Sequence, residues 1–79
     1  MTELEQLAVA SGVSLAELAR RCGMSRASLS RVLRGEEVPT AFRSAALADQ
    51  LGISHARFVA LLAAAVARRA WERSGRAAV

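Results

Sequence analysis

Residues 14–35 read SLAELARRCGMSRASLSRVLRG, a run in which two candidate helix caps and two glycines lie close together. Ser14, followed three residues later by Glu17, has the spacing of a capping box, which starts a helix. Gly23 can end that helix, and Ser25 can cap the next one only two residues further on. The second helix stops at the last glycine of the stretch. The pattern therefore predicts two short helices joined by a tight turn.

The small and apolar residues of this stretch are placed for close packing of the two helices. Ala19 is small where the helices approach each other most closely, and Gly23 can adopt the left-handed backbone conformation that the turn requires. The side chains expected to fill the space between the helices are Leu15, Leu18, Cys22, Met24, Leu29 and Val32. Because a generic helical hairpin does not need all of these features, residues 14–35 predict a helix-turn-helix.

Capping and stop signals on both sides predict three more helices. Thr2 has capping-box spacing to a glutamate and starts a short first helix, Thr40 caps a fourth helix, and Ser54 caps a fifth over residues 55–73. The apolar positions expected in the fourth helix are Phe42, Ala45, Leu47, Ala48 and Leu51. The sequence thus predicts one all-α domain of five helices over residues 1–74, followed by a loose tail over residues 75–79.

Composition favours a globular helical chain with an anionic partner. The 79 residues are 53% hydrophobic and 23% charged, with a net charge of +4, and every basic residue is arginine. Arginine binds guanine and phosphate bidentately, although the preference for it over lysine can also reflect a GC-rich genome. Residues 18–34 contain five arginines and no acidic residue. Such a basic stripe indicates nucleic-acid binding, whereas an ordinary solvated face would carry mixed signs.

The stretch resembles the helix-turn-helix of phage repressors and Cro proteins, which bacterial regulators and antitoxins share. The resemblance runs from Ser14 to Gly35 and continues in Pro39-Thr40, Leu47-Ala48 and residues 51–54. It implies a compact lambda-repressor-like DNA-binding domain. Two features depart from the family pattern, because the first helix is short and the fifth is longer and richer in alanine. These departures leave the DNA-reading unit intact and bear on the oligomeric state.

The resemblance also implies roles on DNA. Arg26, Ala27 and Arg31 match the positions at which the family touches base edges; an arginine suits guanine and an alanine suits the thymine methyl group. The candidates for phosphate contacts are Ser14, Ser25, Ser28, Ser30, Arg34 and Arg43. Ser14 and Ser25 also serve as helix caps in any case.

The fifth helix carries two apolar stripes, which is one more than a surface helix needs. Phe58, Leu61, Leu62 and Ala65 are expected to face the domain core. The second stripe, which would face water in a monomer, consists of Val59, Ala63, Val66, Ala70 and Trp71. We expect it to form a homodimer that binds a palindromic site, the alternatives being packing on the first helix or binding of another protein. Trp71 can equally cap the monomer core.

The remaining polar and reactive residues do not indicate a catalytic, redox or metal-binding site. Cys22 is expected to fill the core rather than to act as a redox switch, and His55 to lie on the surface rather than to sense pH. The residues contain no catalytic constellation, phosphate-binding glycine loop or metal set, so we expect neither an enzyme nor a cofactor. The acidic start does not resemble a signal peptide, and the longest apolar run, residues 58–67, is too short to span a membrane. A cytoplasmic protein at the nucleoid of a bacterium or phage-infected cell is expected.

These observations predict sequence-specific binding of double-stranded DNA by a small transcriptional regulator. The simplest form is a Cro-like or repressor protein that blocks a promoter, and a phage or a bacterial origin fits equally well. The alternative is an antitoxin-like subunit that binds a partner protein through its last helix. The operator, the target genes and the direction of regulation stay open at this point.

Overall fold

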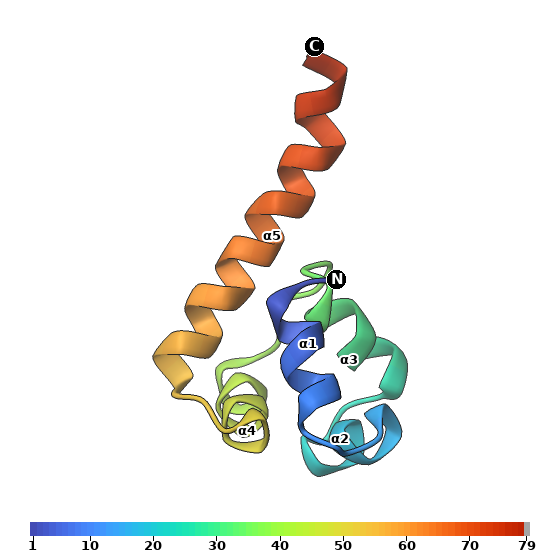
Figure 1. The fold of residues 1–79 in the computed structure, drawn as a ribbon, viewed down its shortest axis with the longest axis vertical. Helices are drawn as coiled ribbons and strands as arrows, with labels where there is room; N and C mark the ends of the chain where they lie inside the picture. The colour runs from blue at the N-terminus through green and yellow to red at the C-terminus, as the bar shows by residue number, and fades with distance from the viewer. Residues whose placement is uncertain (79) are drawn as a thin grey trace.

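The computed structural model describes the backbone of residues 1–78 and the side chains of residues 1–75. The described chain is all-α, and its helices are α1 (Glu3–Ala10), α2 (Leu15–Arg21), α3 (Arg26–Leu33), α4 (Ala41–Leu51) and α5 (His55–Ala78). The first four helices form a globule, and α5 packs on it at its beginning and then extends away (Figure 1). The predicted all-α fold with five helices and a helix-turn-helix is confirmed.

Each helix begins at the Ser or Thr that the sequence predicts. The hydroxyls of Thr2, Ser14, Ser25, Thr40 and Ser54 each accept a hydrogen bond from the backbone N–H three residues later, at 3.0–3.2 Å. Thr2 and Glu5 complete their capping box. The second predicted capping box is only half formed, because the Glu17 carboxylate accepts from Arg20 and Arg21 instead of the Ser14 backbone N–H.

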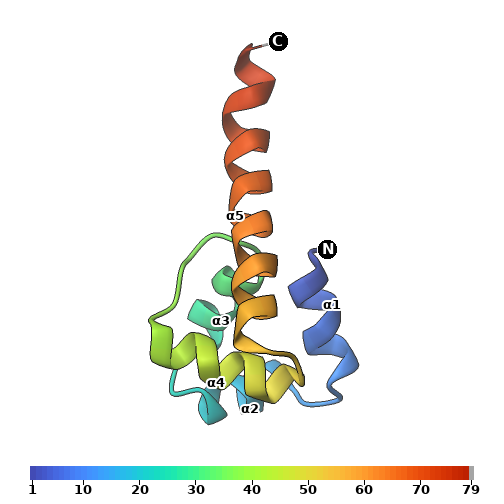
Figure 2. The same ribbon diagram turned by 90° about the vertical axis from the view of Figure 1, so that its left-hand side faces the viewer.

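The hydrophobic core lies between the four short helices and is closed by the first turns of α5. The largest side chains that are fully buried are Leu4, Leu18, Leu29, Val32, Leu47 and Phe58. In Figure 2, α3 and α1 flank α5 while α4 crosses its base. The predicted inner stripe of α5 is confirmed, since Phe58, Leu62 and Ala65 are buried and Leu61 packs against the core. Cys22 is buried in this core and His55 is exposed, as expected.

Two predicted apolar positions of α4 are wrong. Phe42 is 82% exposed and Ala45 is also exposed, whereas Ser44 is buried at 6%. Leu47 and Ala48 fix the rotation of α4, and Ser44 is the one residue that is three positions before Leu47 and four before Ala48, so it lies at the centre of their face. Ala45 is only two positions before Leu47 and lies at the edge of this face, and Phe42, two positions before Ser44, points to solvent.

The last helix is longer than the sequence predicts. It continues to Ala78, so residues 75–78, which we expected in a tail, are helical, and Val79 lies outside the described residues. Within the last turns the Trp71 ring covers Gly75, because a Cβ added there would lie 2.9 Å from Trp71 Cδ2. No single described helix is long and apolar enough to cross a membrane. The helices α4 and α5 reach that length and apolar composition only when they are taken together, and the chain bends by 105° between them.

A glycine sets the distance between α3 and α5. Gly35 follows α3 with a φ of +79°, and a Cβ placed on it would lie 2.6 Å from the Ala65 carbonyl carbon and 2.8 Å from Val66 N. Both of these atoms belong to the α5 backbone, so no side chain can move aside. Only a residue without a side chain lets the end of α3 touch α5, and this contact orients α5 against the globule.

Candidate nucleic-acid interface

The turn between α2 and α3 has the geometry that fixes a helix-turn-helix. Gly23 has a φ of +68°, and its N–H donates to the Arg20 carbonyl at 3.2 Å while Met24 N–H donates to the Ala19 carbonyl at 3.0 Å. These paired bonds form a Schellman motif, which ends α2 and redirects the chain at once. Ala19 is 2% exposed, so the helices are in close contact at this position. The packing therefore holds α3 at one angle to α2.

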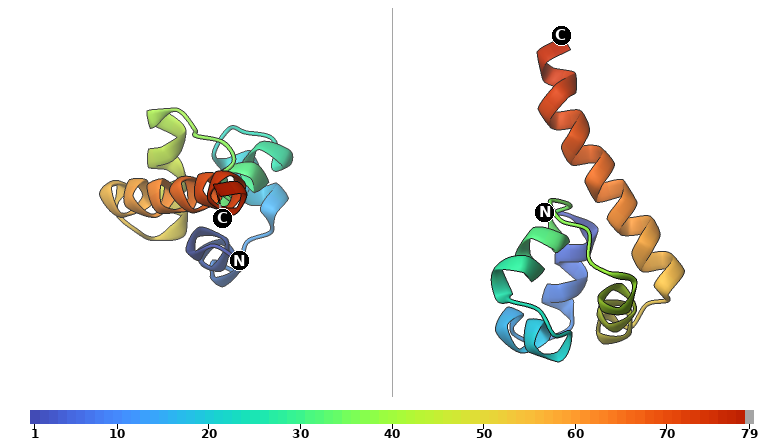
Figure 3. Two further views of the ribbon diagram at one scale, coloured as in Figure 1. Left: turned by 90° about the horizontal axis from the view of Figure 1, so that it is seen from above. Right: turned by 180° about the vertical axis from the view of Figure 1, so that it is seen from behind.

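The outer face of α3 carries the predicted base-reading residues. Arg26, Ala27 and Arg31 are all exposed, while Leu29, Val32 and Leu33 bury the opposite face. Ala27 and Arg31 are four residues apart and therefore lie one above the other. Figure 3 shows α2 and α3 together on the side of the globule opposite the start of α5, so the globule leaves this face open. Among the described residues no ion pair forms at Arg26.

The four predicted serine contacts fall into two groups. Ser14 and Ser25 are exposed caps whose hydroxyl oxygens accept the N–H of Glu17 and Ser28. Their own hydroxyl protons are not used in those bonds and remain available as donors. Ser28 and Ser30 are half-buried and engaged within the protein: Ser28 Oγ donates to Glu37, and Ser30 Oγ accepts from Arg34 Nη1 at 2.9 Å.

Arg34 and Arg43 are the predicted contacts to the flanking phosphates, and they differ in how many of their guanidinium nitrogens are bound within the protein. Arg34 is exposed, but its Nε donates to Glu36 Oε2 at 2.6 Å and its Nη1 to Ser30. Arg43 is exposed at the start of α4, and among the described residues its guanidinium forms no ion pair. Arg34 can therefore offer one free nitrogen, which suits a phosphate contact better than a bidentate contact with a base.

Glu36 and Glu37 change the electrostatic interpretation of the basic stripe. In the sequence they follow the stripe, but in the structure they fold back onto it: Glu37 Oε1 accepts from Arg31 Nε at 3.0 Å, and Glu36 pairs with Arg34 and with Arg69 of α5. Glu17 likewise pairs with Arg20 and Arg21. The expected acid-free stripe is thus partly compensated, because residues just outside a segment in sequence can contact it after a turn.

These carboxylates are held in their charged forms. The Ser28 hydroxyl and the Arg31 guanidinium lower the pKa of Glu37, and the Arg34 guanidinium lowers the pKa of Glu36. Hydrogen bonds from Arg20 and Arg21 lower the pKa of Glu17 in the same way. Hydrogen bonding to an ionised acid favours its ionised form. At neutral pH the surface therefore combines free and paired guanidinium groups in a fixed arrangement.

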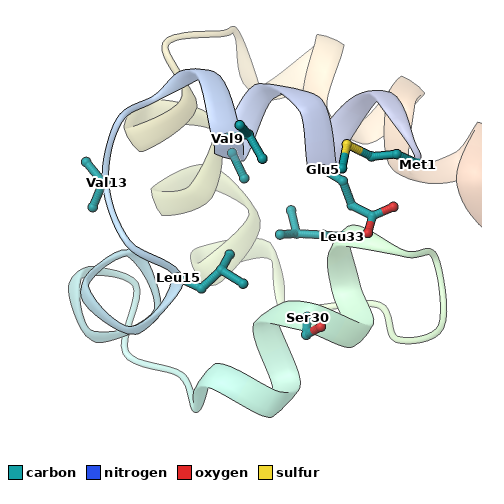
Figure 4. A pocket seen from close by; sticks show the side chains of 8 residues that line it. Met1, Glu5, Val9, Val13, Leu15, Ser30 and Leu33 are labelled. Carbon is teal, nitrogen blue, oxygen red and sulfur yellow. The ribbon is translucent and has the colours of Figure 1, made fainter.

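A hollow of about 230 Å³ borders the same unit on its α1 side. Figure 4 shows it between α1, the start of α2, and α3, with Val9, Leu15 and Leu33 among its lining side chains. Ser30 also lines it, which places this serine at the edge of α3 rather than on its open face. The walls are mostly apolar, so the hollow has little to offer a phosphate.

The predicted dimer residues lie on an outer strip of α5. Val59 is 49% and Trp71 is 69% exposed, Ala63 and Ala70 are also exposed, and Val66 is only half exposed because it packs against the core. An apolar groove follows this strip, and its lining residues are Val38, Val59, Leu62, Ala63, Val66 and Ala67. Val38 was missed in the sequence because it belongs to the loop before α4, and only the fold brings it beside α5.

Two helices joined by a fixed glycine turn, the second with an open and arginine-bearing face, define a DNA-binding helix-turn-helix domain. Residues 2–61 match the family model described as a helix-turn-helix domain, and the chain belongs to this family. The match covers α1 to α4 and ends within α5 at residue 61. No curated protein and no solved structure matches the chain.

Proposed function

We propose that the protein is a small transcriptional regulator that binds a specific sequence in double-stranded DNA, as Cro and phage repressors do, and blocks a promoter. The observation that carries this proposal is the open face of α3, where Arg26 and Arg31 are exposed on a helix that the Gly23 turn fixes. Such a helix fits the major groove, and arginine is the residue best suited to read guanine there.

The proposed contacts divide between bases and backbone. Arg26 and Arg31 read guanines and Ala27 meets a thymine methyl group. The phosphate contacts set the register of α3 in the groove. They are made by the exposed residues Ser14, Ser25 and Arg43, and we include Ser28, Ser30 and Arg34 as additional phosphate contacts.

A matched pair of arginine variants tests this proposal. Arg31 and Arg57 are both exposed and each forms one ion pair, Arg31 with Glu37 and Arg57 with Glu3 at 2.8 Å, but Arg57 lies on α5 away from α3. After selection from a pool of randomised duplexes, Arg31→Ala should lose about 1–3 kcal/mol for its own base pair and relax the preference there. Arg57→Ala, with the same change in net charge, should keep the selected sequence. Equal losses on all duplexes would make Arg31 a phosphate contact, and failure of the wild type to enrich any sequence would refute the proposal.

We further propose that two copies associate through the outer strip of α5. The strip residues Val59, Ala63, Val66 and Ala70 recur at intervals of four, three and four, which is the spacing of a helix–helix seam. Small side chains at this seam let an identical helix approach closely, and a twofold pair needs one patch complementary to itself. Four of the five strip residues lie beyond residue 61, where the family match ends, and α5 extends away from the globule towards its C-terminal end.

Light scattering across concentration tests the dimer. The wild type should show twice the mass of the 8.4 kDa chain, and Ala63→Glu should return it to the monomer without unfolding, because Ala63 is exposed. A wild-type monomer at all concentrations would refute the dimer and would favour the binding of another protein to the strip, as in an antitoxin-like subunit.

Charge reversal of Arg26 and Arg31 separates DNA binding by α3 from protein association through α5. The variant should lose DNA binding and keep its protein association.

A further inference from the structure

Glu37 contacts two residues of the proposed DNA-reading surface at once. Its Oε2 accepts from Ser28 Oγ and its Oε1 accepts from Arg31 Nε at 3.0 Å. Both carboxylate oxygens are therefore occupied, so the carboxylate cannot rotate without breaking a bond. Because Ser28 and Arg31 are three residues apart, they lie on the same side of α3 and present a pair of donors to it.

The way in which Arg31 is bound leaves its reading end free. Its hydrogen bond to Glu37 uses Nε, and among the described residues neither Nη1 nor Nη2 has a partner. A guanidinium held by Nε keeps its two terminal nitrogens as a fork, which is one geometry that matches O6 and N7 of guanine. Arg34 differs, since Nε and Nη1 are both bound within the protein.

The neighbouring Glu36 has a different arrangement. A single oxygen, Oε2, accepts from Arg34 at 2.6 Å and lies 3.3 Å from Arg69 Nη1, so Glu36 links the end of α3 to α5. Glu36 has the same charge as Glu37 and lies in the same loop. Its backbone N–H donates to the Arg31 carbonyl at 2.8 Å, a bond that an alanine variant keeps, but its carboxylate pairs only with Arg34 and Arg69 among the described residues.

We propose that Glu37 is a positioning residue that determines specificity by fixing Arg31 with its terminal nitrogens directed at the base, a role that rests on the DNA-binding function proposed above. A carboxylate beside the phosphate backbone repels DNA and weakens binding to every sequence. The structure assigns Glu37 a compensating effect: it restricts the flexible arginine to one geometry before binding, which raises the preference for the correct base pair.

The test compares Glu37→Ala with Glu36→Ala on duplexes selected by the wild type from a randomised pool. Both variants should bind unrelated duplexes more tightly by a similar factor, because each removes one negative charge. Only Glu37→Ala should reduce the ratio between the selected duplex and one changed at the Arg31 base pair, by about fivefold or more, the lower value of one bidentate contact. Equal ratios for the two variants would overturn the proposal.

A double-mutant cycle shows whether the effect runs through Arg31. In an Arg31→Ala background, Glu37→Ala should no longer change the ratio at that base pair. An undiminished change would mean that Glu37 acts by another route, and the inference would fail. If Glu37→Ala unfolds, Glu37→Gln keeps the shape and one acceptor oxygen and should lower the ratio by a smaller factor. Failure of the wild type to select any sequence would instead count against the proposed function itself.

Discussion

Replacing Gly35 by alanine should destabilise the protein more than the same change at any other turn glycine. The new Cβ would lie 2.6 Å from the Ala65 carbonyl carbon and 2.7 Å from its oxygen, with Val66 N at 2.8 Å. Favourable carbon contacts need about 3.5–4.0 Å, so α5 would have to move away from α3 by roughly 1 Å. Both sides of the contact are backbone, and the shift must therefore be made by a whole helix.

Two costs add up at this position. An L-residue in the left-handed region, at the φ of +79° that Gly35 adopts, costs about 1–2 kcal/mol. Overpacking of a close contact adds about 1–3 kcal/mol. The expected loss is thus about 2–5 kcal/mol, against a total stability of about 4–12 kcal/mol for a chain of this length. The melting temperature should fall by roughly 4–8 °C for each kcal/mol lost.

Gly52→Ala provides the matched control. Gly52 has a nearly equal φ of +72°, but a Cβ there would meet nothing within 4 Å, so only the backbone cost of about 1–2 kcal/mol applies. Urea unfolding should be followed by far-UV circular dichroism, because Trp71 is 69% exposed and reports poorly on the core. Equal losses for Gly35→Ala and Gly52→Ala would refute the close contact between α3 and α5.

Other properties can be checked with single measurements. Leu29→Ala, at a site that is 0% exposed between α2 and α3, should cost about 2–5 kcal/mol in urea unfolding, whereas Phe42→Ala, at an exposed site, should change stability by less than about 0.5 kcal/mol. Burial raises the pKa of the Cys22 thiol, so iodoacetamide should alkylate it only as fast as the protein opens, and rapid labelling of the folded protein would contradict its burial. Three carboxyls have folded pKa values below 4.5, so the stability they add is present above pH 4.5 and is lost as the pH falls through those lowered values. The melting temperature should therefore stay constant from about pH 8 to 5 and decrease below pH 5. In that range Glu17, Glu36 and Glu37 become protonated and their ion pairs with arginine are lost.

Short-range sequence signals were enough to predict where each described helix starts and the turn that joins α2 to α3, although not the length of α5. Capping hydroxyls and glycines act within four or five residues, so their effect is local and can be read without knowing the fold. Thr2, Ser14, Ser25, Thr40 and Ser54 all cap as their positions predict. Helical periodicity likewise separated the buried face of α3 from its open face.

Features that depend on how distant segments pack together could not be predicted from the order of the residues. Rotation of α4 about its axis put Ser44 inside and Phe42 outside, because the core favours the face that carries Leu47 and Ala48. Periodicity alone could not settle this for a helix with apolar residues on several sides.

The same reason applies to the nucleic-acid interface. The chain must leave α3 and turn back before Glu37 can reach Ser28 and Arg31, six or more residues earlier, and no helical spacing predicts that return. The contact of Gly35 with the α5 backbone, thirty residues later in the chain, is equally invisible in the sequence. Local hydrogen bonding thus specified the reading helix, while long-range packing specified which carboxylates surround its arginines and where α5 leaves the globule.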